Sequence, residues 1–145
     1  MVRHLIYALV VACVMTACGG TGRSVDMHDV EHHRWSATED FFYDNHDTLS
    51  KRDIGIVVRY GGESVAESVE MTILTISPDS LVAAEPFMLH IPQMGDMRPA
   101  EHTFTYRHNA ILDRKGRYLF RLKPTHTAEG ISSVGIVITE PEIVE

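Results

Sequence analysis

Three histidines lie close together near residue 30, and their side chains are of a kind that binds transition metals. They are His28, His32 and His33, with Asp29 and Glu31 among them. Imidazole and carboxylate groups are common ligands of zinc and copper. The surrounding segment is polar and has no apolar periodicity, so ordering it around a metal would cost roughly 1 kcal/mol or more per residue. We therefore treat the three histidines as weak metal candidates and predict neither a bound metal nor another cofactor.

An aromatic run lies a few residues further along, flanked by carboxylates. The run is Phe41-Phe42-Tyr43, and the carboxylates are Glu39, Asp40, Asp44 and Asp47. An exposed ring beside carboxylates suits stacking against a sugar, as in a glycan-binding module. Successive side chains of a strand point to opposite faces, so at least one ring must point outward. Trp35 and Phe42 are the candidate binding residues, although the spacing favours the interpretation in which Trp35, Phe41 and Tyr43 anchor the first strand in a core.

Cys18 occupies a position that implies a covalent modification. It closes the run Met15-Thr16-Ala17-Cys18 after an apolar stretch and is followed by two glycines, a pattern that looks like the lipobox of a bacterial lipoprotein. Arg3 and His4 precede the apolar stretch, as in an export signal. The stretch is shorter than the roughly 20 residues that a spanning helix needs. We predict that residues 1–17 are a lipoprotein signal peptide and that Cys18 becomes an acylated N-terminus, which attaches the chain to a membrane.

Charge and cysteine content exclude several classes of function. All 20 acidic residues follow Cys18, whereas Arg3 precedes it, so the chain from Cys18 onward carries a formal net charge of −8. No basic run suited to nucleic-acid phosphates occurs, and we predict no nucleic-acid partner. The motifs of serine hydrolases, phosphate-binding loops and zinc peptidases are absent from the sequence. Cys13 would leave with the signal and Cys18 would carry the lipid, so no thiol remains for catalysis. We predict that the protein is not an enzyme.

The chain after Trp35 is typical of an all-β domain. Ile54, Ile56, Val58 and Tyr60 share one face of a strand, and Tyr118, Phe120 and Leu122 share one face of another, opposite Arg117, Arg121 and Lys123. Further short apolar runs occur at 41–45, 69–76, 87–91, 102–107 and 134–139, and turn residues separate them. About seven strands without intervening helices favour an antiparallel β-sandwich at residues 35–145, of jelly-roll or immunoglobulin-like type. The polar segment 18–34 is predicted to be a flexible, lipidated tether.

Two segments of the C-terminal half carry a family resemblance. They read GRYLFRL at 116–122 and GISSVGIVI at 130–138. They resemble the closing strands of the gliding-motility lipoproteins of the GldH family in Bacteroidota, in which G-x-Y-x-F-x-(Leu/Ile) is followed by G-I-x-x-V-G-(Leu/Ile)-x-I. The resemblance extends to the early Cys18, to Trp35 ahead of the first strand and to the strand from Ile54 to Arg59. It therefore spans most of the chain after Cys18.

The resemblance implies a function in the cell envelope. Members of this family look like non-enzymatic accessory lipoproteins of the gliding machinery, which is linked with type IX secretion, and homologues also occur in non-gliding relatives. It implies an outer-membrane protein that is attached through its N-terminal lipid and acts through contacts with other envelope proteins, including gliding components. Residues 19–23 lack the acidic run associated with surface export, which favours the periplasmic face over the cell surface. The alternative, from a different class, is a small glycan-binding surface lipoprotein.

Overall fold

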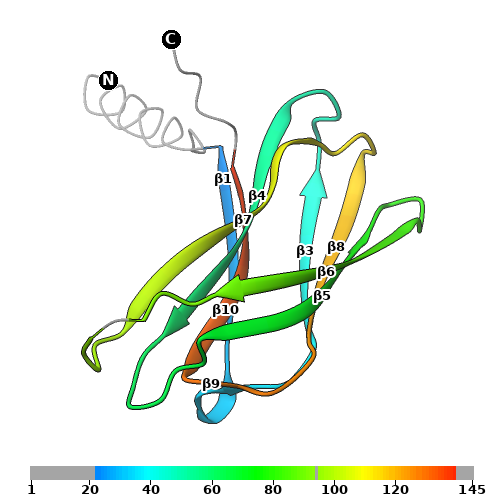
Figure 1. The fold of residues 1–145 in the computed structure, drawn as a ribbon. Helices are drawn as coiled ribbons and strands as arrows, with labels where there is room; N and C mark the ends of the chain where they lie inside the picture. Colours follow the sequence, from blue (N-terminus) through cyan, green and yellow to red (C-terminus); the bar gives the residue numbers. More distant parts are fainter. Residues whose placement is uncertain (1–21, 94, 140–145) are drawn as a thin grey trace, which may run out of the picture.

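The computed structural model describes residues 22–93 and 95–139, and these residues are almost entirely β-structure (Figure 1). One short 3₁₀ turn, η1 (Glu31–His33), interrupts the strands described there. The long strands are β1 (Arg23–Asp29), β3 (Glu39–Asn45), β4 (Lys51–Tyr60), β5 (Ser68–Ile76), β6 (Val82–His90), β7 (Ala100–Ile111), β8 (Gly116–Pro124) and β10 (Ile131–Thr139). Two strands of two residues each, β2 (Arg34–Trp35) and β9 (Ala128–Glu129), pair with each other.

The long strands form two four-stranded antiparallel sheets in the described part of the chain. One has the order β1-β10-β4-β7 and the other the order β3-β8-β5-β6. If the eight long strands are renumbered 1 to 8 along the chain, without β2 and β9, the two sheets have the strand orders 1-8-3-6 and 2-7-4-5. This is the arrangement of a jelly roll, in which two Greek keys are shared between two packed sheets. The predicted all-β antiparallel fold is confirmed, and the jelly roll is the one of its two alternatives that the topology matches.

The core lies between the sheets and is made by the predicted inward faces. The hydrophobic residues predicted to point inward from the two clearest strands are all buried, namely Ile54, Ile56, Val58 and Tyr60 of β4 and Tyr118, Phe120 and Leu122 of β8. Val134, Ile136 and Ile138 of β10 join them from the first sheet. Period-2 alternation therefore predicted the register of these strands correctly, because each has one face that leaves water.

The prediction of a flexible tether over 18–34 is wrong for residues 23–34. β1 pairs with β10 along its whole length, from Arg23 opposite Thr139 to Asp29 opposite Ser133. The apolar residues of β1, Val25 and Met27, lie on its outer face, whereas Asp26 and His28 lie on the inner face at the sheet edge. The strand has no apolar inner face, so its composition looked like that of a solvated segment.

All seven predicted strands overlap observed ones, and the boundaries differ most in β6. That strand begins at Val82, five residues before the predicted start, and it contains Pro86. Proline cannot donate a backbone hydrogen bond, so it is tolerated in strands mainly at the edge of a sheet. β6 is such an edge strand, paired only with β5. The edge position explains why a segment that contains proline is nevertheless a strand.

Candidate functional site

The outer face of the β3-β8-β5-β6 sheet carries an apolar row that crosses all four strands. Phe41 is buried in the core, so alternation turns its neighbour Phe42 outward. Phe42 pairs with Leu119 across β3 and β8, and Leu119 pairs with Ile76 across β8 and β5. Val82 of β6, opposite Ile76, completes the row. We call Phe42, Leu119, Ile76 and Val82 the apolar row.

Two cross-strand ion pairs lie on either side of the Phe42–Leu119 pair. Arg121 donates from Nε and Nη2 to the two carboxylate oxygens of Asp40, at 2.7 and 2.8 Å. Arg117 donates from Nε to Asp44 at 2.9 Å. The hydrogen bond from each guanidinium lowers the pKa of its carboxyl partner below the ordinary value, so both aspartates are ionised at neutral pH. Each ion pair is neutral as a unit, and the surface between them is apolar.

The face has the properties of a protein-binding surface. The Phe42 side chain is 55% exposed, and the guanidinium of Arg117 lies 5.5 Å from its ring centroid. Aromatic and arginine side chains supply much of the binding energy in protein interfaces, where they are surrounded by polar groups that exclude water. A contiguous apolar strip on the surface of a small domain commonly marks an interaction site. The arrangement offers an apolar surface to a partner, and the carboxylates beside it, Asp40 and Asp44, are held in ion pairs.

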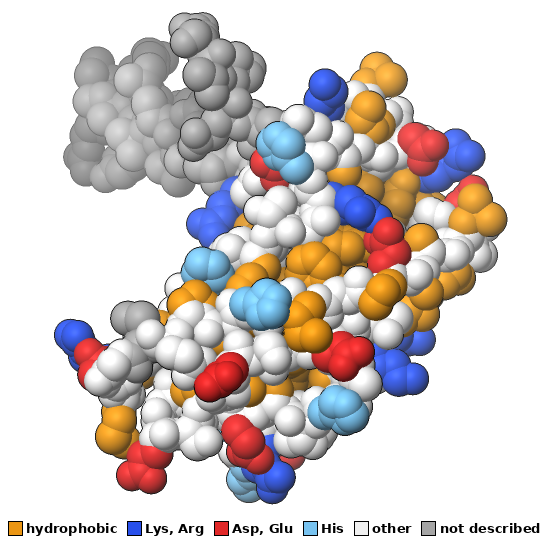
Figure 2. All heavy atoms as spheres, in the orientation of Figure 1, with side chains coloured by type: hydrophobic (Ala, Val, Ile, Leu, Met, Phe, Trp, Pro, Cys, Tyr) orange, Lys and Arg blue, Asp and Glu red, His pale blue; other side chains and the backbone are white. Residues whose placement is uncertain are grey.

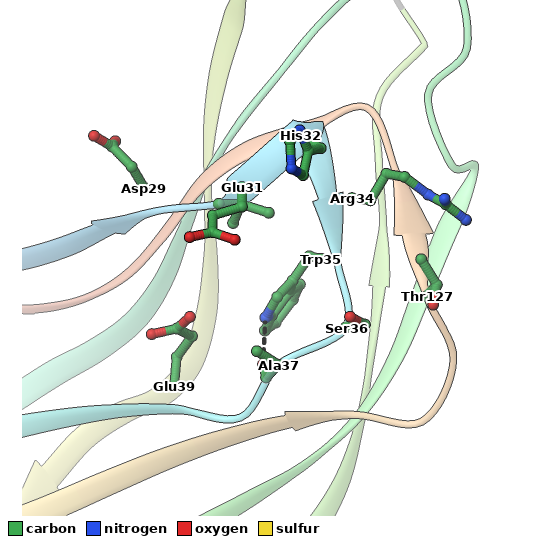
Figure 3. A pocket seen from close by; sticks show the side chains of 10 residues that line it. Asp29, Glu31, His32, Arg34, Trp35, Ser36, Ala37, Glu39 and Thr127 are labelled. Atoms are coloured by element: carbon green, nitrogen blue, oxygen red, sulfur yellow. Dashed lines mark hydrogen bonds between the residues drawn. The ribbon is translucent and has the colours of Figure 1, made fainter.

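Trp35, the other candidate binding residue, belongs to the core. Its side chain is 1% exposed, and its Nε1 donates a hydrogen bond to the carbonyl oxygen of Ala37 at 2.9 Å. Figure 3 shows the indole beneath the turn that joins β1 to β2, with its nitrogen directed at Ala37. Because no face of the ring reaches solvent, Trp35 cannot stack against a ligand. It anchors the start of the second sheet, which is the structural role that its spacing favoured.

A cavity of about 720 Å³ opens beside Trp35, and carboxylates lie along one side of it (Figure 3). The carboxylates are Asp29, Glu31 and Glu39. Two of them are already engaged, since Ser133 Oγ donates to Asp29 at 2.9 Å and the His28 ring bonds Glu39 at 2.8 Å. The cavity is therefore an acidic hollow at the junction of β1 and β3, with much of its hydrogen-bonding capacity satisfied internally.

The structure does not bring the three candidate histidines together as a metal site. His28 packs against Phe41, with ring centroids 4.4 Å apart, and bonds Glu39. His32 and His33 lie on the exposed η1 turn, and both have positive φ. Within residues 22–93 and 95–139, no group of three or more histidine, cysteine, aspartate or glutamate residues has the geometry to hold a metal ion. His28 instead fixes the inner face of β1 against β3.

Cys18 and the signal segment 1–17 lie outside the described residues, so the lipidation of Cys18 stays a prediction. In the described part of the chain, no helix is long and apolar enough to cross a membrane. No protein-family model matches this chain, and no curated protein matches it.

Sequence reasoning identified Phe42 but missed the other members of the apolar row. Leu119 stands between the inward residues Tyr118 and Phe120, so an apolar side chain at its outward position was a usable signal. Ile76 gave the same signal at the end of β5. What the sequence could not supply was the register between β5 and β8, because the paired residues lie more than forty positions apart and β6 and β7 lie between the two strands in the chain. Only the pairing shows that the outward apolar residues form one row.

Proposed function

We propose that this protein is a non-enzymatic lipoprotein of the bacterial outer membrane that acts by binding another envelope protein through the apolar row. The observation that carries the proposal is the row itself, which crosses four strands between two satisfied ion pairs. A small domain gains nothing for its own stability from leaving Phe42 exposed beside Leu119. The resemblance to the gliding-motility lipoproteins of the GldH family supports an accessory role in gliding or type IX secretion-linked machinery, at the periplasmic face.

Attachment to the membrane depends on Cys18 in this proposal. Two or more acyl chains on one residue give stable anchoring, whereas a single chain gives only marginal binding. Changing Cys18→Ser should abolish incorporation of labelled palmitate and release the protein from the membrane fraction. Palmitate recovered in the Cys18→Ser protein at the wild-type level would contradict the anchor.

The second candidate function is glycan binding, and the orientation of Phe42 favours it. The ring points outward beside Asp40 and Asp44, as a sugar-stacking ring would. Against it, Arg117 lies over that ring, so a sugar could stack on that side only after displacing the guanidinium from its bond with Asp44. The four-strand extent of the apolar row also exceeds the contact that one sugar ring makes. Both features favour a protein partner.

Matched substitutions on the two sheets distinguish these functions. Phe42→Asp places a charge in the apolar row, and Val25→Asp places the same charge on an exposed apolar position of the other sheet. For full-length protein solubilised from membranes, we expect co-purifying envelope partners to be lost with Phe42→Asp and kept with Val25→Asp. A glycan panel should show no binding by either protein or by the wild type. Glycan affinity in the millimolar range or tighter that disappears in Phe42→Asp, with partners unaffected, would establish the alternative.

A further inference from the structure

One end of the sandwich is fixed close to Cys18 by the position of β1. β1 begins at Arg23, which pairs with Thr139, and Thr139 pairs in turn with Asp53 near the start of β4. Five residue steps separate Cys18 from Arg23. A fully extended chain spans at most about 3.6 Å per residue, so these steps cover no more than about 18 Å. A lipid on Cys18 would therefore hold this end of the domain near the bilayer surface. We call it the proximal end.

Three connections between strands lie at the proximal end, and the structure ties them together. They are the β3–β4, β5–β6 and β7–β8 connections, at residues 46–50, 77–81 and 112–115. Asn45 Nδ2 donates to the carbonyl oxygens of Leu112 and Arg114, both at 2.8 Å, which joins β3 to the β7–β8 connection. Arg114 pairs with Asp79 at 3.1 Å, which adds the β5–β6 connection. In Figure 1 the first and third connections lie with the start of β1 at the upper end of the sandwich.

Each of these connections exposes an aliphatic side chain. Leu49 in the β3–β4 connection is 84% exposed, Leu81 in the β5–β6 connection is 66% exposed, and Ile111, the last residue of β7 before the β7–β8 connection, is 51% exposed. Figure 2 shows hydrophobic side chains along the upper and right-hand rim of the molecule, next to both basic and acidic side chains. Aliphatic side chains that protrude in this way contribute little to the core. We call Leu49, Leu81 and Ile111 the apolar rim.

The described residues at the two ends of the domain differ in which charged side chains lack an ion-pair partner. Lys51 and Lys115 are exposed at the proximal end, and neither has an ion-pair partner among the described residues. The other charges there are mostly paired, as in Arg52 with Asp47 at 3.6 Å. At the opposite end the exposed acidic residues exceed the basic ones, and in the described chain Glu31, Glu63 and Glu67 make no ion pair. Among the described residues, Lys51 and Lys115 therefore offer two unpaired cations to an anionic surface, whereas the opposite end offers unpaired carboxylates.

We propose that the proximal end docks on the bilayer, with Leu49, Leu81 and Ile111 inserted among the headgroups and with Lys51 and Lys115 bound to anionic phospholipid. The proposal rests on the lipid anchor at Cys18 and extends it to the domain. Basic residues near an anionic leaflet gain about 1 kcal/mol each, which is about fivefold in affinity per lysine. The lysine stems can lie along the apolar rim while their ammonium groups reach phosphate. The docked orientation brings Val82 of the apolar row, which directly follows Leu81, close to the headgroups and leaves Phe42 and Leu119 further along the row accessible to a partner.

Two single-cysteine variants of the lipidated, full-length protein test the orientation. In Leu49→Cys the new thiol lies on the apolar rim, and in Met97→Cys it replaces an apolar residue at the opposite end that is also exposed, at 60%. Each is spin-labelled and reconstituted in vesicles of phosphatidylethanolamine with 30% phosphatidylglycerol. We expect the label at position 49 to be protected from a water-soluble relaxation agent and accessible to oxygen, and the label at 97 to behave as in solution.

The lysines have a matched control of their own. Lys51→Glu combined with Lys115→Glu should return the label at position 49 to aqueous accessibility, whereas Lys123→Glu, on the outer face of β8, should leave it protected. An acylated protein whose label at 49 is as water-accessible as the label at 97 would overturn the docked orientation and leave the anchor standing. A protein that carries no acyl chain would overturn the anchor and the orientation with it.

Discussion

The outer faces of the two sheets differ in how far their apolar side chains are exposed to solvent. On the β1-β10-β4-β7 sheet, Val57 points outward yet is only 1% exposed, because neighbouring side chains close over it. Glycines make the closure possible: Met27 Cγ lies 2.6 Å from where a Cβ of Gly135 would be, beside Val57 in the pairing. On the β3-β8-β5-β6 sheet Phe42 stays 55% exposed, with the guanidinium of Arg117 5.5 Å from its ring centroid. The middle of the first face is covered by its own chain, although Val25 at the β1 edge stays exposed, whereas the second face is available to a partner.

This difference shows that apolar content alone does not identify an interaction face. Both sheets carry aliphatic residues that face outward. On the β1-β10-β4-β7 sheet, small residues on β4 and β10 leave room for side chains of β1 and β7 to cover these aliphatic residues. β3 and β8 have long charged residues at the corresponding outward positions, and these pair with each other instead of covering the row. The apolar row is accordingly the part of the surface where we expect mutations to affect function without affecting stability.

The largest expected effect comes from the inner side of the sheet that carries the apolar row. Phe120 is fully buried, and Phe120→Ala removes a core aromatic, which should cost roughly 3–5 kcal/mol of unfolding free energy. Leu119→Ala, one residue along the strand on the outer face, should cost about 1 kcal/mol or less. Urea unfolding of the two variants measures the difference. Equal losses would mean that Leu119 is part of the core and that the apolar row is not a surface.

A smaller effect on stability is expected at Gly135, where β1 packs closely against β10. A Cβ added at Gly135 would lie 2.3 Å from the backbone oxygen of Asp26, so Gly135→Ala must push β1 away from β10. Overpacking of this kind typically costs about 1–3 kcal/mol. Gly95→Ala is the control, because nothing lies within 4 Å of the added carbon. Hydrogen exchange should report faster opening of β1 in Gly135→Ala but not in Gly95→Ala. Unchanged protection of β1 in Gly135→Ala would show that the close packing at Gly135 does not hold β1 against β10.

The ion pairs beside the apolar row should contribute least to stability. Arg121 and Asp40 are both more than a third exposed, and water screens ion pairs at such positions, so Arg121→Ala should cost little stability. The lowered pKa of Asp40 means that the pair stabilises the fold fully above the ordinary carboxyl pKa of 3.8 and loses this contribution as the pH falls below it.

The same substitution has a specific effect on titration. Carboxyl NMR should show the pKa of Asp40 rising toward 3.8 in Arg121→Ala, while Asp44, held by Arg117, keeps its lowered pKa. The two aspartates are thus each other's control. A pKa of Asp40 that does not respond to the loss of Arg121 would show that the guanidinium does not lie against it.

The sequence predicted the interior of the fold better than its surface. Burial on one face leaves a period-2 pattern, which is why Ile54 to Tyr60 and Tyr118 to Leu122 were assigned to the correct faces. β1 left no such pattern, because His28 faces inward and Val25 outward at the edge of the sheet. Its stability comes from pairing with β10, and that pairing joins residues more than a hundred positions apart.

The candidate site was predictable only in part, because it too depends on pairing between strands that are distant in the sequence. An outward ring among Phe41, Phe42 and Tyr43 follows from alternation along one strand. The continuity of that ring with Leu119 and Ile76 follows from register between strands that are distant in sequence. Local patterns cannot supply such register.

Site-specific photo-crosslinking in living cells tests the central claim most directly. A photoreactive amino acid at position 119 lies within the apolar row, and one at Thr105 lies on the exposed outer face of the other sheet, opposite Gly55. We predict that position 119 crosslinks the membrane-attached protein to one discrete envelope protein, that Thr105 gives no such product, and that Phe42→Asp removes the product at 119. Identical crosslinking patterns at the two positions, or a product at 119 that survives Phe42→Asp, would contradict the account.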